Sequence, residues 1–173
     1  MLLTTGDSFT YGTELADNNC AWPYMLAQYL KCDVVNLAEP GASNDFILRS
    51  TVEGIKQHKP KLVIVAWTTP DRFELNGEHY TPNRNPREFR SWNTDWATQK
   101  FAVQVELLER YIDCEYYFTE PWDCRIDDCG AVVGSLVQFC EGFEKGPGGH
   151  PLQQGHIAIA KRLFDCIESA RKT

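Results

Sequence analysis

Two residues that can form a nucleophile–base pair stand near opposite ends of this chain of 173 residues. Ser8 follows a short apolar segment at the N-terminus, and His150 precedes the last amphipathic segment. A serine hydroxyl becomes a nucleophile when an imidazole within hydrogen-bond reach takes its proton. Such partners are usually far apart in sequence, so a fold has to bring them together. The pair predicts a serine hydrolase in which Ser8 attacks and His150 acts as general base.

Apolar runs alternate with amphipathic stretches, which is typical of a parallel sheet covered by helices. The clearest strand is predicted at 61–67, where a continuous apolar run follows Lys61, as expected for a strand buried on both faces. Sites in such sheets form at the carboxyl ends of the strands, so Ser8, Gly41 and Thr69 should reach the same edge. Other strands are predicted at 2–5, 34–37 and 115–119, and helices at 22–30, 43–59, 93–112 and 152–170.

The length fits one domain, residues 1–173, with a sizeable core. Two segments without clear periodicity, at about 68–92 and 120–147, are predicted to be loop insertions, the second with a short helix around 131–139. The first insertion contains aromatic residues that suit a sugar or aryl ester pocket, or that simply pack the loop down. Its basic residues are balanced in number by acidic ones, so no strong preference for anions is predicted. The aromatic and basic residues are Phe73, Tyr80, Trp92, Arg72, Arg84, Arg87 and Arg90.

Composition excludes several classes of partner. The net charge of -7 argues against nucleic acid, and no apolar stretch approaches the roughly 20 residues that span a bilayer. The chain shows no signal peptide, so we expect synthesis in the cytoplasm. Seven cysteines without a CxxC pair predict reduced thiols, and no metal or other cofactor is implied.

Three motifs together resemble the SGNH (GDSL-type) hydrolases over nearly the whole chain. They are Gly6-Asp7-Ser8, Gly41-Ala42-Ser43-Asn44 and His150-Pro151. The resemblance implies a flavodoxin-like, three-layer α/β/α sandwich with a mainly parallel sheet. It also implies an esterase, lipase or carbohydrate deacetylase whose oxyanion hole uses the backbone N–H groups of Ser8 and Gly41. The family's third oxyanion donor is an asparagine side chain after the third strand.

Two departures from the family pattern bear on catalysis. The asparagine after the third strand is absent, and Thr69 is the nearest hydroxyl donor to its place. The family's aspartate three residues before the histidine is replaced by Pro147. Either a backbone carbonyl orients His150 in a Ser–His dyad, or another carboxylate does so. The candidates are Asp123, Asp127, Asp128 and Glu144.

Three other residues are candidates for support or substrate contact. Asp7 is expected to tie down the turn at Ser8, as aspartates in turns commonly do. Asn44 either caps the following helix or supports the active site. Arg72 is the best candidate for substrate contact, because it lies close to Thr69 in sequence. His156 opens the last helix, where it is expected to pack or cap.

The sequence therefore predicts a serine esterase that acts through an acyl-enzyme on a small acyl group, such as acetyl, carried by a carbohydrate. A second hypothesis belongs to a different class. The compact chain and its variant motifs look similar to SGNH proteins encoded by bacteriophages. Such a protein could be a weakly active or inactive virion component that binds host surface glycans and contacts other virion proteins.

Overall fold

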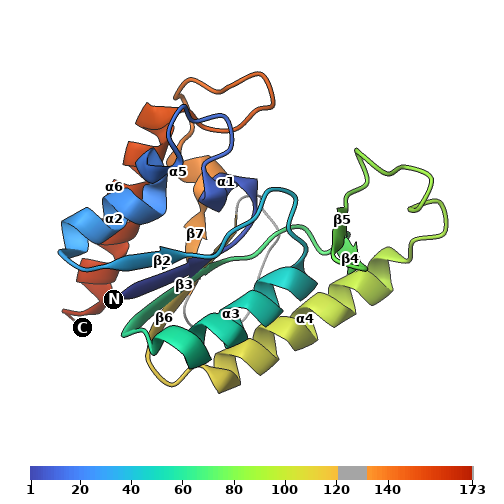
Figure 1. Ribbon diagram of the computed structural model, residues 1–173, viewed down its shortest axis with the longest axis horizontal. Helices are drawn as coiled ribbons and strands as arrows, with labels where there is room; N and C mark the ends of the chain where they lie inside the picture. The colour runs from blue at the N-terminus through green and yellow to red at the C-terminus, as the bar shows by residue number, and fades with distance from the viewer. Residues whose placement is uncertain (121–131, 173) are drawn as a thin grey trace.

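The computed structural model describes residues 1–120 and 132–172, which form a parallel five-stranded sheet (Figure 1). The strand order is β2-β1-β3-β6-β7, and each neighbouring pair runs parallel. The fold class expected from the sequence is thus confirmed. The strands are β1 (Leu2–Thr5), β2 (Val34–Asn36), β3 (Leu62–Ala66), β6 (Glu115–Glu120) and β7 (Val132–Ser135).

Long helices cover both faces of the sheet and make three layers. Helices α2 (Trp22–Leu30) and α6 (Gln153–Ala170) cover one face, and α3 (Asn44–His58) and α4 (Thr94–Tyr111) cover the other (Figure 1). Successive strand residues enter opposite cores, as the pleat of a strand requires: Leu2 packs with Trp22 and Leu163, while Leu3 packs with Ile47 and Leu108. Burial on both faces explains the continuous apolar run in β3.

The predicted loop at 68–92 contains a small hairpin, and this corrects the sequence interpretation. Strands β4 (Phe73–Leu75) and β5 (Glu78–Tyr80) pair in antiparallel fashion around Asn76 and Gly77. Both turn residues have positive φ, 53° and 82°, as a two-residue hairpin turn requires. The aromatic residues of this segment pack on one another: Phe73 stacks on Tyr80 at 4.9 Å and on Trp92 at 5.1 Å.

The segment expected to be irregular at 120–147 contributes the edge strand β7. The predicted short helix at 131–139 is right only for its second half, where α5 (Leu136–Phe139) follows directly after β7. Residues 121–131, which include Asp123, Asp127 and Asp128, lie outside the described part of the chain. Two further short elements, α1 (Ser8–Tyr11) and η1 (Asn18–Cys20), lie between β1 and α2.

Neither a disulfide nor a membrane-spanning helix occurs in residues 1–120 and 132–172. Each cysteine in these ranges is a free thiol. Of the helices in the same ranges, none combines the length and the apolar character needed to cross a bilayer. The free thiols are Cys20, Cys32, Cys114, Cys140 and Cys166, whereas Cys124 and Cys129 lie outside these ranges.

His156 is completely buried near the start of α6 and joins that helix to α2. The backbone N–H of Trp22 donates to its Nδ1 at 3.2 Å, so the ring is neutral with its proton on Nε2. Burial, helped by repulsion from His150, lowers the pKa of His156 from 6.5 to about 4. Packing and capping were both open for this residue, and the structure shows a histidine that packs inside the fold.

This buried histidine predicts a loss of stability in mild acid. The unfolded chain protonates His156 near pH 6.5 and the folded chain only near pH 4, so its contribution is full above pH 6.5 and is lost as the pH falls toward 4. The full effect is about 3 kcal/mol. In urea unfolding at several pH values, the free energy of unfolding should depend less on pH in His156→Gln than in wild type. His58→Gln, at a half-buried position, is the control. Identical slopes in wild type and His156→Gln would contradict the assignment.

Candidate active site

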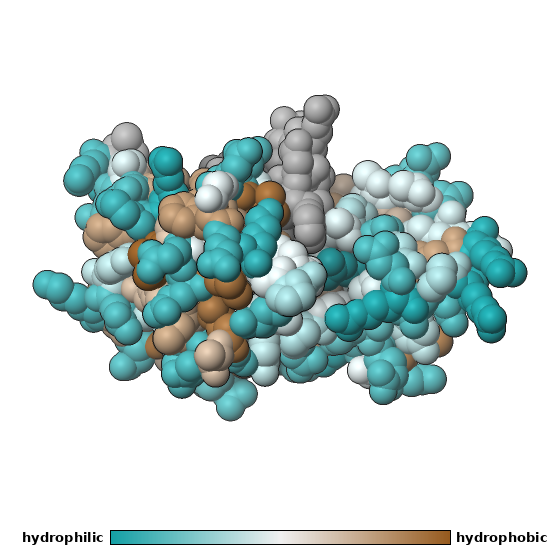
Figure 2. Space-filling view, turned by 90° about the horizontal axis from the view of Figure 1, so that it is seen from above, coloured by the Kyte–Doolittle hydropathy of each residue, from teal (hydrophilic) through white to brown (hydrophobic). Residues whose placement is uncertain are grey.

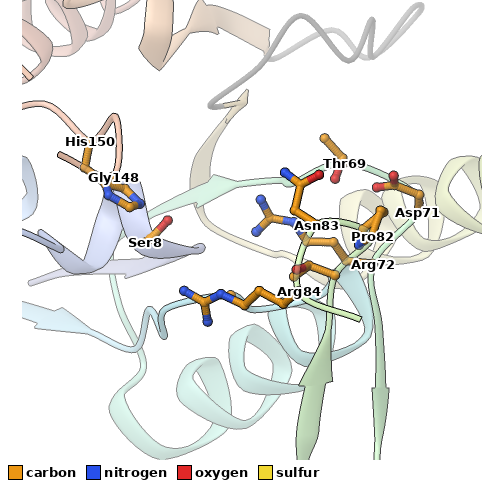
Figure 3. Close-up of a pocket in the computed structure, with 11 residues that line it drawn as sticks. Ser8, Thr69, Asp71, Arg72, Pro82, Asn83, Arg84, Gly148 and His150 are labelled. Carbon is orange, nitrogen blue, oxygen red and sulfur yellow. The ribbon is translucent and has the colours of Figure 1, made fainter. Parts of the chain in front are cut away.

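The sequence-predicted residues Ser8, Gly41, Thr69, Arg72 and His150 all line one half-open pocket of about 420 Å³ (Figure 3). Ser8 follows β1, Gly41 follows β2, and both Thr69 and Arg72 follow β3, whereas His150 lies between α5 and α6. The residues meet at one edge of the sheet, as expected for a parallel α/β fold. The structure thus brings together residues 142 positions apart, Ser8 and His150. The other lining residues are Asp71, Thr81, Pro82, Asn83, Arg84 and Gly148.

A tight turn places Ser8 at the start of α1 directly after β1. Gly6 makes this turn possible, because a Cβ there would overlap the side chain of Thr10 and come within 2.9 Å of Ala66. Gly41, on the loop after β2, has a φ of 80°, a conformation that favours glycine. Gly6 is thus needed for packing against Thr10 and Ala66, and Gly41 for its backbone conformation. The oxyanion hole at Ser8 and Gly41 stays a prediction.

Asp7 ties the turn at Ser8 to the loop after β3. It is fully buried, and its Oδ1 accepts a hydrogen bond from the backbone N–H of Phe9 at 3.1 Å. Its Oδ2 accepts from the Thr68 hydroxyl and from Arg72 Nη1, each at 2.9 Å. Asp7 thus has the structural place expected for it. Arg72 lines the pocket, and its Nη1 is bound to this carboxylate.

Asn44 connects the second motif to the loop after β3 and does not cap α3. Its Nδ2 donates to the carbonyl of Thr68, and its Oδ1 accepts from the N–H of the same residue, both at 2.9 Å. The cap of α3 is Ser43, whose hydroxyl accepts from the N–H of Phe46 at 3.3 Å. Of the two roles left open for Asn44, the structure therefore favours support of the site.

Glu14 is the residue that sequence reasoning missed. Its Oε2 lies 2.7 Å from His150 Nδ1 and also accepts the backbone N–H of His150 at 3.2 Å. Its Oε1 accepts the backbone N–H of Gly148 at 2.7 Å. A carboxylate from the segment after α1 thus occupies the place beside the imidazole that Pro147 cannot fill. Glu144, a sequence candidate for this role, is exposed, with no hydrogen bond to His150 in the described structure.

The local backbone is shaped around the Glu14 carboxylate. Glu14 has a φ of 72°, a left-handed conformation that is strained for a residue with a Cβ and that clusters at functional sites. The loop before His150 closes on it because two positions lack side chains. A Cβ at Gly146 would come within 2.6 Å of the carboxylate carbon, and one at Gly148 within 3.0 Å of Oε2.

The electrostatics of this contact set the tautomer of His150. Hydrogen bonds from the Gly148 backbone and from the His150 side chain lower the pKa of Glu14 below its usual 4.5. An ionised carboxylate only accepts, so His150 Nδ1–H donates to it and Nε2 is left with a free lone pair. Phe9 packs against the ring at a centroid distance of 5.6 Å. Figure 3 shows the imidazole directed toward Ser8.

The far side of the pocket is occupied by Thr69 and Asp71. In Figure 3 both lie across the pocket from Ser8, whereas the guanidinium groups of Arg72 and Arg84 extend toward the serine. Thr69 as third oxyanion donor therefore stays a prediction. The sequence did not single out Arg84 beyond its membership of the loop.

A second, more apolar pocket adjoins the first and shares three lining residues with it. The shared residues are Thr69, Asp71 and Pro82, and the additional apolar walls come from Pro70, Phe89 and Trp92. Its volume is about 480 Å³. Figure 2 shows the mixed polar and apolar character of the molecule on one side. The aromatic side chains of the second pocket thus adjoin the pocket that holds Ser8 and His150.

Comparison of sequences does not identify a family for this chain. No protein-family model matches it, and no curated protein matches it. Solved structures do match. TesA is 15% identical with a TM-score of 0.66, over 97% of this chain and 98% of that one. The esterase EstA from Pseudoalteromonas sp. is 13% identical with a TM-score of 0.66, over 99% and 98%.

A third similar structure is a two-domain esterase active on acetylated mannans, 14% identical with a TM-score of 0.66, over 99% of this chain and 50% of that one. At such low identity these matches show the fold. The chain has the SGNH hydrolase fold, shared by carbohydrate esterases and lipases. The comparisons give no support to the bacteriophage origin suggested by the sequence.

Proposed function

We propose that this protein is a serine esterase that removes a small acyl group, such as acetyl, from a carbohydrate. The observation that carries the proposal is the contact between Glu14 and His150 Nδ1 at 2.7 Å, in a pocket that also holds Ser8. This contact orients the imidazole and leaves Nε2 as the proton acceptor, which is the arrangement a serine nucleophile needs.

The reaction follows from these positions. Ser8 Oγ attacks the ester carbonyl while His150 Nε2 takes its proton, and the backbone N–H groups of Ser8 and Gly41 bind the oxyanion. The bond from the acyl carbon to the sugar oxygen then breaks, and His150 returns the proton to that oxygen. Water, deprotonated by His150, attacks the acyl-enzyme, and Ser8 Oγ leaves with that proton. Glu14 stabilises the imidazolium in both halves of the reaction.

Three features support a carbohydrate ester as substrate. Eight of the eleven residues that line the pocket carry polar or charged side chains, and its volume is about 420 Å³, so it suits a short acyl group better than a long lipid chain. The adjoining pocket presents Phe89 and Trp92, flat surfaces on which a sugar ring can pack. Similar folds include an esterase described as active on acetylated mannans. The lack of an acid partner for His150 in the sequence motif favours a protein that only binds glycans. In the structure Glu14 contacts His150 Nδ1, and this contact favours an enzyme.

A fluorophosphonate tests the proposal without any assumption about the substrate. Intact mass should show one adduct on wild type, mapped to Ser8, and none on Ser8→Ala. His150→Ala should slow adduct formation strongly, because the general base is lost. A wild-type protein that stays unmodified at Ser8 after long exposure would rule out an activated serine and leave glycan binding as the remaining function of the pocket.

A further inference from the structure

The guanidinium of Arg84 is a cation in the pocket that the reaction described above does not use. It lines the pocket with Ser8 and His150, and its Nη1 lies 3.7 Å from the position that a Cβ on Gly41 would take. Within the described residues the guanidinium has neither an ion pair nor a hydrogen bond, whereas Arg72 is bound to Asp7. Arg84 is therefore available to a ligand next to the proposed oxyanion hole.

A closed turn holds the backbone of Arg84 in this place. The carbonyl of Thr81 accepts hydrogen bonds from the N–H groups of Arg84 at 3.1 Å and Asn85 at 2.9 Å. The N–H of Thr81 donates to the Asn85 side chain at 3.1 Å. This ordering reduces the conformational entropy lost when the side chain binds a ligand. The turn follows β5 and brings Arg84 over the loop that carries Gly41.

Three of the four acidic residues of this loop stand outside the pocket lining. Glu74 makes a two-oxygen contact with Arg49 at 2.8 Å, and Glu78 and Glu88 are exposed. Asp71 is the carboxylate that lines the pocket, and Figure 3 places it at the far side from the Arg84 guanidinium. The pocket is therefore polarised, with positive charge toward Ser8. Equal numbers of charges in the sequence concealed this separation.

We propose that Arg84 binds a carboxylate carried by the substrate, so that the protein prefers esters of acidic sugars, such as acetylated uronic acids. A guanidinium matches a carboxylate in two parallel hydrogen bonds, and both are strengthened by charge. The side chain lies beside Gly41, so the carboxylate binds near the reacting ester. Asp71, on the opposite wall, accepts hydrogen bonds from sugar hydroxyls. The inference rests on the proposed esterase function and adds the substrate class.

A matched pair of substrates tests this inference: methyl O-acetylglucuronoside and methyl O-acetylglucoside, which differ only in carboxylate against hydroxymethyl. Wild type should favour the uronoside in kcat/KM, and added salt should reduce the preference. In Arg84→Gln the loss should be about tenfold to a hundredfold larger on the uronoside than on the glucoside. Arg87→Gln, in the same loop but outside the pocket lining, should keep the wild-type preference.

Two results would overturn the inference. Equal losses on both substrates in Arg84→Gln would make Arg84 a general oxyanion donor, and no loss on either would leave it without a role. A binding measurement on variants without the Ser8 hydroxyl tests this inference separately from the esterase proposal. Ser8→Ala should bind methyl glucuronoside in calorimetry, and the Ser8→Ala, Arg84→Gln double variant should not. Arg84-dependent binding would support the carboxylate site even if fluorophosphonate failed to modify Ser8, and binding independent of Arg84 would refute it.

Discussion

Replacing Glu14 with glutamine is expected to lower kcat for ester hydrolysis on the order of 10³-fold with little change in KM. Glutamine can still accept the backbone N–H of Gly148, so the loop before His150 should keep its course. It carries no charge, however, to stabilise the imidazolium or to favour the tautomer with the proton on Nδ1. Glu14 touches His150 and not the substrate, so it acts as a positioning residue and its loss should appear in kcat.

The measurement is a steady-state assay on a simple aryl acetate, with the rate of fluorophosphonate labelling of Ser8 as a second readout. Glu144→Gln is the matched control, because Glu144 is the exposed glutamate near His150 in sequence and should leave both rates unchanged. Glu14→Asp should recover part of the rate, since its shorter side chain keeps the charge. The wild-type NMR spectrum should show a low-field Nδ1 proton that disappears in Glu14→Gln. A rate within about threefold of wild type in Glu14→Gln would refute the role.

The predicted part of the fold depends on features that are local in sequence. The apolar run of β3 and the amphipathic period of α6 each report burial within one element, so the sheet and its two helical layers followed from the pattern. The turn at Gly6-Asp7-Ser8 is equally local. The hairpin of β4 and β5 was missed, although Asn76-Gly77 is a strong signal for a hairpin turn. Its two strands are only three residues long each and show no clear alternation of apolar and polar residues.

The missed part of the site depends on distances that sequence spacing does not encode. Glu14 reaches His150 across 136 positions, through a left-handed backbone and a loop whose glycines leave room for the carboxylate. A search for the acid near the histidine in sequence could not find it. The run Gly146-Pro147-Gly148-Gly149 was the available signal, because so many small residues before a candidate base indicate that another group packs there. Arg84 was missed because the number of acidic and basic residues in the loop does not show which of them form ion pairs. Glu74, for example, is paired with Arg49, which lies outside the loop.

Replacing Asp7 with alanine is expected to lower the free energy of unfolding by about 3–5 kcal/mol, the usual effect of breaking a buried ion pair. Asp7 is fully buried, and the Arg72 side chain that it binds is only 14% exposed. Alanine would leave that guanidinium, the Thr68 hydroxyl and the N–H of Phe9 without their partner. For a protein of this size the melting temperature should fall by roughly 10 °C or more.

Asp17→Ala separates this effect from simple capping. Asp17 caps η1 just as Asp7 caps α1, by accepting the N–H two residues ahead, that of Asn19 at 2.9 Å, but it is exposed and lacks the arginine. Its loss should cost about 1 kcal/mol. Arg72→Met in the Asp7→Ala background should recover part of the stability, because the unpaired buried charge is removed. Equal costs for Asp7→Ala and Asp17→Ala in urea unfolding would show that Asp7 only caps α1. A larger cost, partly relieved by Arg72→Met, would show that the Asp7–Arg72 pair holds the serine turn against the loop after β3.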